Sequence, residues 1–139
     1  MQIYKPSHFR IEELVDKKTF NDRGEKAWQL LDDRALFVLQ LLRKRYGPIT
    51  VNNWLWGGDR QWSGLRTKEC SIGATYSQHR FGRAFDCLIK NATAEEVRKD
   101  MLDFWPKQMY NFPITMEDDV SWFHFDTRQQ ENPVNIFKP

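Results

Sequence analysis

Two short segments of the chain carry the side chains best suited to bind a metal ion. The first contains His79 and Asp86, and the second contains His124, which is followed two residues later by Asp126. Two imidazoles and one carboxylate supply three protein ligands for zinc and leave a fourth position open for water. The remaining histidine, His8, lies far from both segments in the sequence. His79, Asp86 and His124 are therefore the candidate ligands of a zinc ion.

The first segment runs into an apolar stretch that predicts a strand over Phe85–Ile89. Burying the charge of Asp86 in such a strand is costly unless the carboxylate is paired or coordinates a cation. Cys87 would point to the opposite face of the strand, so it is not expected to be a ligand. Cys70 and Cys87 form no C-x-x-C motif and no disulfide framework, and we expect two reduced, partly buried thiols.

The second segment predicts a strand over Val120–Asp126, with His124 between two phenylalanines. Pairing of the two strands would bring His124 against Asp86. Gly82 permits a tight backbone bend, so that the loop before it can fold His79 over the pair. The sequence therefore offers a simple way to assemble all three ligands.

The rest of the chain predicts an α+β fold with a small, mostly antiparallel sheet and flanking helices. A broad apolar face predicts a helix over Asp33–Tyr46. Asp32 or Asp33 can cap its start, and Gly47 stops it. A capping box, Thr93 to Glu96, opens another helix that ends near Trp105. Less regular signals predict a helix or turn over 9–14, a short helix over 25–31, strands over 49–54 and 114–116, and an irregular stretch from 57 to 78.

Length, composition and charge exclude several functional classes. A chain of 139 residues fits one domain, residues 1–139. The net charge of +2 is too small to indicate a nucleic-acid partner. No apolar run approaches the roughly 20 residues that cross a bilayer, so no membrane insertion is expected. Residues 1–8 have no apolar signal-peptide core. We therefore expect synthesis in the cytoplasm, with export, if any, provided by another component.

The two metal motifs resemble those of the zinc D-Ala-D-Ala peptidases, whose fold is shared with the signalling domain of hedgehog proteins. The family pattern Ser-x-His-x-x-Gly-x-Ala-x-Asp is followed by Trp-x-His-x-Asp. This chain matches them at Ser77, His79, Gly82, Ala84, Asp86, Trp122, His124 and Asp126. A weaker match, Ser63-Gly64-Leu65-Arg66, is similar to the family's Ser-Gly-x-Arg segment, and the resemblance covers roughly residues 30–128.

The resemblance implies a zinc-dependent peptidase that cleaves peptidoglycan stem peptides, either as a D,D-carboxypeptidase or as an endolysin-type endopeptidase. The size, the missing signal peptide and the Trp-rich loop are most similar to small phage-encoded members. Such proteins are made in the host cytoplasm and reach the cell wall after holin release or as part of a virion, so virion proteins are further expected partners. The alternative is a non-catalytic virion or wall-binding module of the same fold that keeps zinc for stability.

Three further residues receive roles from the resemblance and from zinc chemistry, each with a plainer alternative. Arg66 would grip a substrate carboxylate with its planar guanidinium, or it makes a structural ion pair. Ser77 would donate to the substrate, or it holds the loop of the first histidine. Asp126 would orient the imidazole of His124 from the same strand face, or it forms a salt bridge with Arg128.

The general base departs from the family pattern. Many members have Glu or Asp three residues before the terminal histidine, where this chain has Ser121. A serine hydroxyl cannot act as a carboxylate base. Asp118 shares strand parity with His124, whereas Glu117 would point inward if the turn is bulged. The sequence leaves Glu117 and Asp118 open as the base. The alternative is that Glu117, Asp118 and Asp119 all merely solvate a hairpin turn.

Overall fold

The computed structural model describes residues 4–139 and forms an α+β fold around one five-stranded sheet. The strand order is β1-β2-β4-β3-β5, and every neighbouring pair is antiparallel except β3 and β5. The predicted α+β class is confirmed, although the sheet is mixed. Residues 1–3 of the segment considered for an export signal lie outside the described residues. The strands are β1 (Ile49–Thr50), β2 (Ala84–Ile89), β3 (Ile114–Glu117), β4 (Phe123–Asp126) and β5 (Val134–Phe137).

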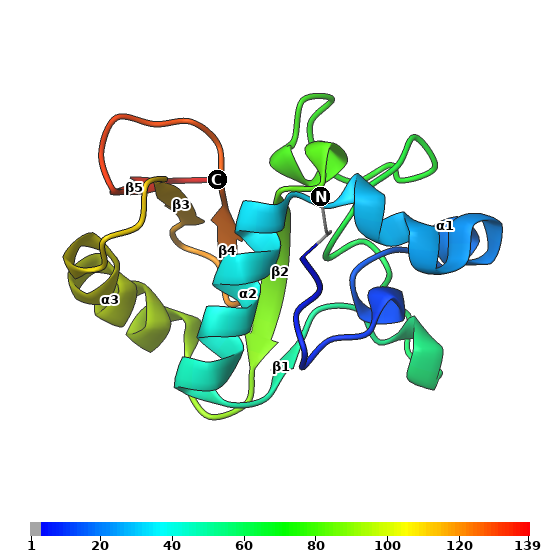
Figure 1. Cartoon of the computed structure of the whole chain (residues 1–139), viewed down its shortest axis with the longest axis horizontal. Coiled ribbons are helices and arrows are strands. Elements are labelled where there is room, and N and C mark those ends of the chain that lie inside the picture. Colours follow the sequence, from blue (N-terminus) through cyan, green and yellow to red (C-terminus); the bar gives the residue numbers. More distant parts are fainter. Residues whose placement is uncertain (1–3) are drawn as a thin grey trace.

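Helix α2 (Asp33–Tyr46) lies across β2, while α1 (Lys17–Arg23) and α3 (Ala94–Phe104) flank it on either side (Figure 1). The bounds of α2 agree with the prediction. Its first turn is capped by Asp32, whose carboxylate accepts from an N–H of that turn, and it ends at Gly47 with a φ of 88°. The predicted capping box opens α3. Short 3₁₀ turns cover Ile11–Glu13, Gly24–Leu30, Trp54–Trp56, Gln78–Phe81 and Trp105–Lys107.

Core packing decides which face of the sheet carries the candidate metal ligands. One apolar cluster joins α2 and α3 to the inner face of β2 and β4. Since strand side chains alternate, the residues between these apolar positions must point to the opposite face. Asp86 and His124 occupy those alternate positions. The inner-face members are Phe85, Cys87, Phe123 and Phe125, packed with Leu36, Leu39, Leu42, Val97 and Met101 of the helices.

The register between β2 and β4 sets Asp86 directly opposite His124. The neighbouring pairs, Phe85 with Phe125 and Cys87 with Phe123, lie in the core. A slip of one residue in either strand would move these aromatic rings out of the core, so the hydrophobic pattern fixes the register. The predicted encounter of the second histidine with the aspartate is confirmed.

Two predicted strands are shorter than expected because other groups capture their backbone. After Thr50 the chain leaves the sheet, since the N–H of Asn52 donates to the carbonyl of Glu13 over 2.9 Å. Strand β4 begins at Phe123 and not at Val120. The carbonyls of Val120 and Trp122 accept instead from the guanidinium of Arg98 of α3.

Two elements were not predicted. In α1, Asp16 supplies the cap by accepting from the N–H of Thr19 over 3.1 Å, and the helix ends at Gly24. These cap and stop signals are present in the sequence. Strand β5 is a short edge strand beside β3, and its own composition is a weak signal. In the part of the chain that is described, no helix combines the length and apolar character needed to cross a membrane.

Candidate metal centre

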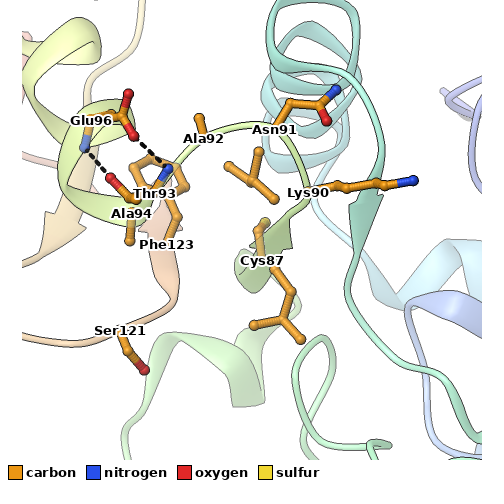
Figure 2. A pocket seen from close by; sticks show the side chains of 11 residues that line it. Cys87, Lys90, Asn91, Ala92, Thr93, Ala94, Glu96, Ser121 and Phe123 are labelled. Carbon is orange, nitrogen blue, oxygen red and sulfur yellow. Dashed lines mark hydrogen bonds between the residues drawn. The ribbon is translucent and has the colours of Figure 1, made fainter.

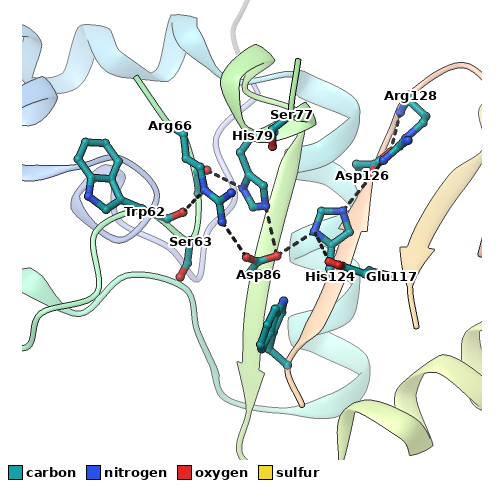
Figure 3. Close-up of polar contacts among 12 residues, drawn as sticks. Trp62, Ser63, Arg66, Ser77, His79, Asp86, Glu117, His124, Asp126 and Arg128 are labelled. Atoms are coloured by element: carbon teal, nitrogen blue, oxygen red, sulfur yellow. Dashed lines mark hydrogen bonds and ion pairs between the residues drawn. The ribbon is translucent and has the colours of Figure 1, made fainter. Parts of the chain in front are cut away.

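The three predicted ligands meet in a buried cluster on the outer face of β2 and β4 (Figure 3). Asp86 Oδ1 lies 3.2 Å from His79 Nε2 and 2.8 Å from His124 Nδ1. The candidate ligand atoms of the three residues all lie within 4.8 Å of one another. His79 and His124 lie far apart in the sequence but thus converge on one point. We call this group the imidazole cluster.

The outer nitrogen of each imidazole is held by an acceptor. His79 Nδ1 lies 2.9 Å from the carbonyl oxygen of Gly64, and His124 Nε2 lies 3.0 Å from Asp126 Oδ2. A carbonyl or carboxylate oxygen can only accept, so each outer nitrogen carries a proton. In a neutral imidazole the inner nitrogen then carries a lone pair that faces Asp86. Hydrogen bonds of this kind are typical of histidines that bind metals.

The inner contacts therefore bring acceptors against an acceptor. Two nitrogen lone pairs point at one carboxylate oxygen, and this arrangement is repulsive unless protons or a cation lie between them. In a tetrahedral zinc site, ligand atoms about 2.0–2.1 Å from the metal are about 3.3 Å apart, close to the 3.2 and 2.8 Å between Asp86 Oδ1 and the two imidazole nitrogens. The donor set and its geometry can hold a metal ion.

The pKa values of the cluster report the same demand for positive charge. Burial lowers the pKa of His124, but hydrogen bonds to Asp126 and Asp86 outweigh it and raise that pKa to about 9. Burial would raise the pKa of Asp86, yet hydrogen bonds from His124 and His79 hold it well below its usual range. The cluster therefore attracts either protons or a metal ion.

The loop that carries His79 is fixed by its two ends. Ser77 caps the 3₁₀ turn by accepting from the N–H of His79 over 3.3 Å. Gly82 ends the turn with a φ of 69°, and a Cβ there would lie 1.9 Å from the carbonyl oxygen of Leu30. Only glycine fits this position. Of the two roles considered for Ser77, the structure shows the one that holds the loop.

The segment that starts at Ser63 runs beside β2 and completes the surroundings of the cluster. The N–H of Asp86 donates to the carbonyl of Ser63 over 2.7 Å. Gly64, whose carbonyl accepts from the first imidazole, packs against the backbone of Leu14, where a Cβ would approach an oxygen to 2.2 Å. Arg66 follows and reaches back to the aspartate. The weak Ser-Gly-x-Arg match thus has a local structural function.

Both arginines considered in the sequence lie against carboxylates that contact the imidazoles. Arg66 Nη2 is 3.3 Å from Asp86 Oδ2. Arg128 donates to Asp126 through Nε at 2.7 Å and Nη2 at 2.6 Å. Asp126 therefore has both of its predicted roles at once. Burial raises the pKa of Asp126, but the hydrogen bonds from Arg128 and His124 outweigh it and lower that pKa overall.

The acidic turn separates the two candidate bases. Glu117 Oε2 lies 3.9 Å from His124 Nδ1, and the side chain lines the cavity in front of the cluster. Asp118 turns the other way, with Oδ1 3.5 Å from Nε of Arg98. Asp119 adopts a φ of 57°, which bends the turn. Of the two residues left open by the sequence, only Glu117 faces the metal ligands.

A cavity of about 800 Å³ opens in front of the imidazole cluster. Its walls include Trp122 and the loop from Ile72 to Gln78. Phe137 of β5 forms a further wall, with its ring edge-on to His124 at a centroid distance of 5.6 Å. Sequence reasoning missed Phe137 because β5 was not predicted, and the only local signal was a short apolar alternation after Pro133.

A second cavity, of about 540 Å³, lies where β2 meets the start of α3 (Figure 2). Thr93 and Glu96 line it, but in the helix cap each side chain already accepts from the backbone N–H of the other residue. Ser121 lines this cavity and not the one at the metal ligands. Cys87 also lies here, and it is free and buried like Cys70, as predicted. We find no reactive arrangement among the residues that line this cavity.

Comparison of the chain with protein-family models, with curated proteins and with solved structures found no match. The fold and the site themselves define the class of this protein. It is an α+β protein with a buried His-Asp-His group that can hold a metal ion.

Proposed function

We propose that this protein is a zinc-dependent peptidase that cleaves peptidoglycan stem peptides. The observation that carries the proposal is the pair of inward ring nitrogens of His79 and His124, which converge on one oxygen of Asp86. Three ligands made of imidazole and carboxylate suit zinc with an open coordination position. Zinc bound there would polarise a carbonyl group and lower the pKa of water.

Glu117 is the group that this chain offers for proton transfer. Its carboxylate lies 3.9 Å from His124 Nδ1, so one water molecule next to the ligands is within its reach. In the proposed reaction Glu117 Oε2 accepts a proton from the attacking water and passes it to the leaving amine. Asp118 is directed at Arg98 and takes no part.

The choice of substrate rests on the resemblance of the two motifs to the zinc D-Ala-D-Ala peptidases. The hedgehog-type fold, a phage origin and action at the cell wall through holin release or a virion belong to the same proposal. The cavity supports a peptide ligand, since it combines the acidic Glu117 with apolar walls such as Trp122 and Phe137.

A non-catalytic, zinc-stabilised virion or wall-binding module is the second candidate. Ser121 at the usual position of the base favours it. The position of Glu117 at the cavity favours the enzyme. The two candidates share the metal centre and differ only in catalysis, so an activity measurement on zinc-loaded protein separates them.

The test is incubation of zinc-loaded protein with purified muropeptides, followed by mass spectrometry of the products. We expect new peptide masses that disappear after treatment with a chelator and return with zinc. Zinc-loaded protein that cleaves no muropeptide would support the non-catalytic module. A protein that takes up no zinc on titration would contradict both candidates.

A further inference from the structure

The cavity in front of the imidazole cluster contains two cationic side chains, and both are already paired. Among the described residues that line it, Arg66 and Arg128 are the only arginines or lysines. Arg66 contacts Asp86, and Arg128 contacts Asp126. Each arginine thus lies behind a carboxylate that itself touches an imidazole.

Arg66 divides the two oxygens of Asp86 between different partners. Oδ1 faces both imidazoles, whereas Oδ2 faces Nη2 of Arg66 at 3.3 Å. The guanidinium is itself anchored, because its Nε donates to the carbonyl of Trp62 over 2.8 Å. Nη1 lies close to Gly73, where a Cβ would come within 2.7 Å of that nitrogen. With a side chain only 12% exposed, Arg66 has little freedom to turn toward a substrate.

Arg128 holds the carboxylate behind the second imidazole. Two of its nitrogens donate to Asp126, which is fully buried and accepts from His124 Nε2 through Oδ2. The guanidinium also stacks over the ring of Phe137, with 4.9 Å to the ring centroid. A two-point contact and a stacked face fix its orientation.

We propose that Arg66 and Arg128 are positioning residues for the metal ligands and do not bind a carboxylate of the substrate. Arg66 holds Asp86 so that a single oxygen faces the metal position. Arg128 holds Asp126 and, through it, the ring of His124. The inference rests on the metal centre of the proposed function. It replaces the carboxylate-gripping role that the family resemblance implies for Arg66 with the structural ion pair that was its alternative.

Metal binding tests the proposal without any need for activity. Arg66→Gln and Arg128→Gln should each weaken zinc binding in a chelator competition by about 10–100-fold, as is typical when a residue that orients a ligand is removed. The cobalt-substituted protein should change its visible absorption in Arg66→Gln, because the freed Oδ2 can join the coordination. Arg23→Gln is the matched control, since Arg23 is exposed on α1 and should leave both measurements unchanged.

The lysine variants separate positioning from bulk charge. Lysine keeps the charge but loses the planar, two-point contact, so Arg128→Lys should recover only part of the zinc affinity. The lysine variants also serve if a glutamine variant does not fold, which circular dichroism would show. Zinc affinity and cobalt spectra that match the wild type in folded Arg66→Gln and Arg128→Gln would overturn the proposal. A wild-type protein that takes up no metal would instead contradict the proposed function.

Peptide cleavage supplies an independent measurement. Each peptidoglycan stem peptide is prepared with a free and with an amidated C-terminus. The ratio of the two kcat/KM values is then compared between wild type and Arg66→Gln. We expect the same ratio in both proteins, because Arg66 is bound to Asp86 and not to the substrate. A large preference for the free carboxylate that falls to about one in Arg66→Gln would overturn the proposal. If neither peptide is cleaved, the metal measurements decide.

Discussion

Two buried polar clusters contact the β3–β4 hairpin from opposite sides, and they differ in how their hydrogen-bond roles match. The first is the imidazole cluster. The second, which we call the Arg98 cluster, is formed by Arg98 of α3 with five partners around the turn. Its partners are the side chains of Glu95 and Asp118 and the carbonyls of Glu117, Val120 and Trp122.

In the Arg98 cluster every partner is an acceptor and the guanidinium only donates. The Nη atoms reach the carbonyls at 3.2–3.4 Å, and Nε lies 3.5 Å from Asp118. The contacts of the Nη atoms need no added ion, and they explain why the chain between β3 and β4 does not continue as a strand. Nε is buried and has no hydrogen-bond partner among the described residues, so Asp118 contributes an ion pair only. Its role is structural.

In the imidazole cluster, once both imidazoles are neutral, the inner contacts join acceptors to an acceptor, and the cluster faces an open cavity. Burial and charge alone therefore do not distinguish a candidate functional site from a structural cluster. The useful sign is a surplus of lone pairs that converge on one point while the outer protons are held elsewhere. The same hairpin sends Glu117 to one cluster and Asp118 to the other.

The largest expected effect is that of Asp86→Ala. The variant should lose metal binding and cleavage together, because it removes the oxygen on which both imidazoles converge. Its free energy of unfolding should fall by about 3–5 kcal/mol, as when one partner of a buried ion pair is removed. Urea unfolding with and without a chelator checks this, and the variant should no longer respond to the chelator.

Asp118→Ala is the matched change in the Arg98 cluster and should keep full metal content. If Asp86→Ala retained a chelator-sensitive unfolding transition, the metal would be bound elsewhere and the distinction between the two clusters would fail.

The next effect concerns the two acids of the turn. Glu117→Gln should reduce turnover by about 10²–10⁴-fold while zinc stays bound, because a general base contributes that much to the rate. Asp118→Asn should keep most of the activity, since its side chain faces Arg98. Steady-state kinetics on zinc-loaded protein gives both values.

Ser121→Ala is the control for the usual base position and should act like the wild type, because Ser121 lines the other cavity. A loss of turnover in Asp118→Asn equal to that in Glu117→Gln, with unchanged stability, would show that the turn rearranges in the active protein.

A smaller effect is expected for Arg98→Met. The change removes the donor for three carbonyls but leaves Glu95 and Asp118 partly in contact with water, so we expect a loss of about 1–3 kcal/mol in the free energy of unfolding. Zinc affinity should stay within a few-fold of the wild-type value. Thermal unfolding and a chelator competition, run side by side, test the separation. Loss of zinc from a folded Arg98→Met protein would couple the two clusters.

The stability of the metal-free protein should depend on pH through His124. In metal-free protein the pKa of His124 is raised to about 9 from its ordinary 6.5. The stability that protonated His124 contributes is therefore complete below pH 6.5 and is lost as pH rises through about 9. Zinc needs the neutral imidazole, so the stabilisation by added zinc should increase over the same range.

Urea unfolding at several pH values, with and without zinc, measures these opposite trends. Metal-free His124→Gln should lack the part of the decline that His124 causes. A metal-free wild type that became more stable between pH 6.5 and 9 would contradict the assignment of lone pairs and protons in the cluster.

The local signals in the sequence were sufficient for several elements. The bounds of α2 and the capping box of α3 depend on neighbours within one or two turns. For the cap of α2 the sequence offered Asp32 or Asp33, and the structure shows Asp32. Two of the three candidate metal ligands were also predictable from local pattern, because alternation along β2 and β4 separates Asp86 and His124 from the apolar core positions. Helix caps and strand alternation are local properties, so they can be recognised in a single sequence.

Only the tertiary structure decided the roles of the surrounding residues. The choice between Glu117 and Asp118 depends on Arg98, which lies about 20 residues earlier on another element. The partner of Arg66 depends on the loop that closes over it, and the wall formed by Phe137 depends on an edge strand that pairs with β3. The sequence thus indicated which side chains converge at the candidate centre, whereas long-range packing determined which acid and which arginines lie beside it. The physical reason is that a side chain's partner is set by contacts between distant segments, and these contacts leave no mark in the local pattern.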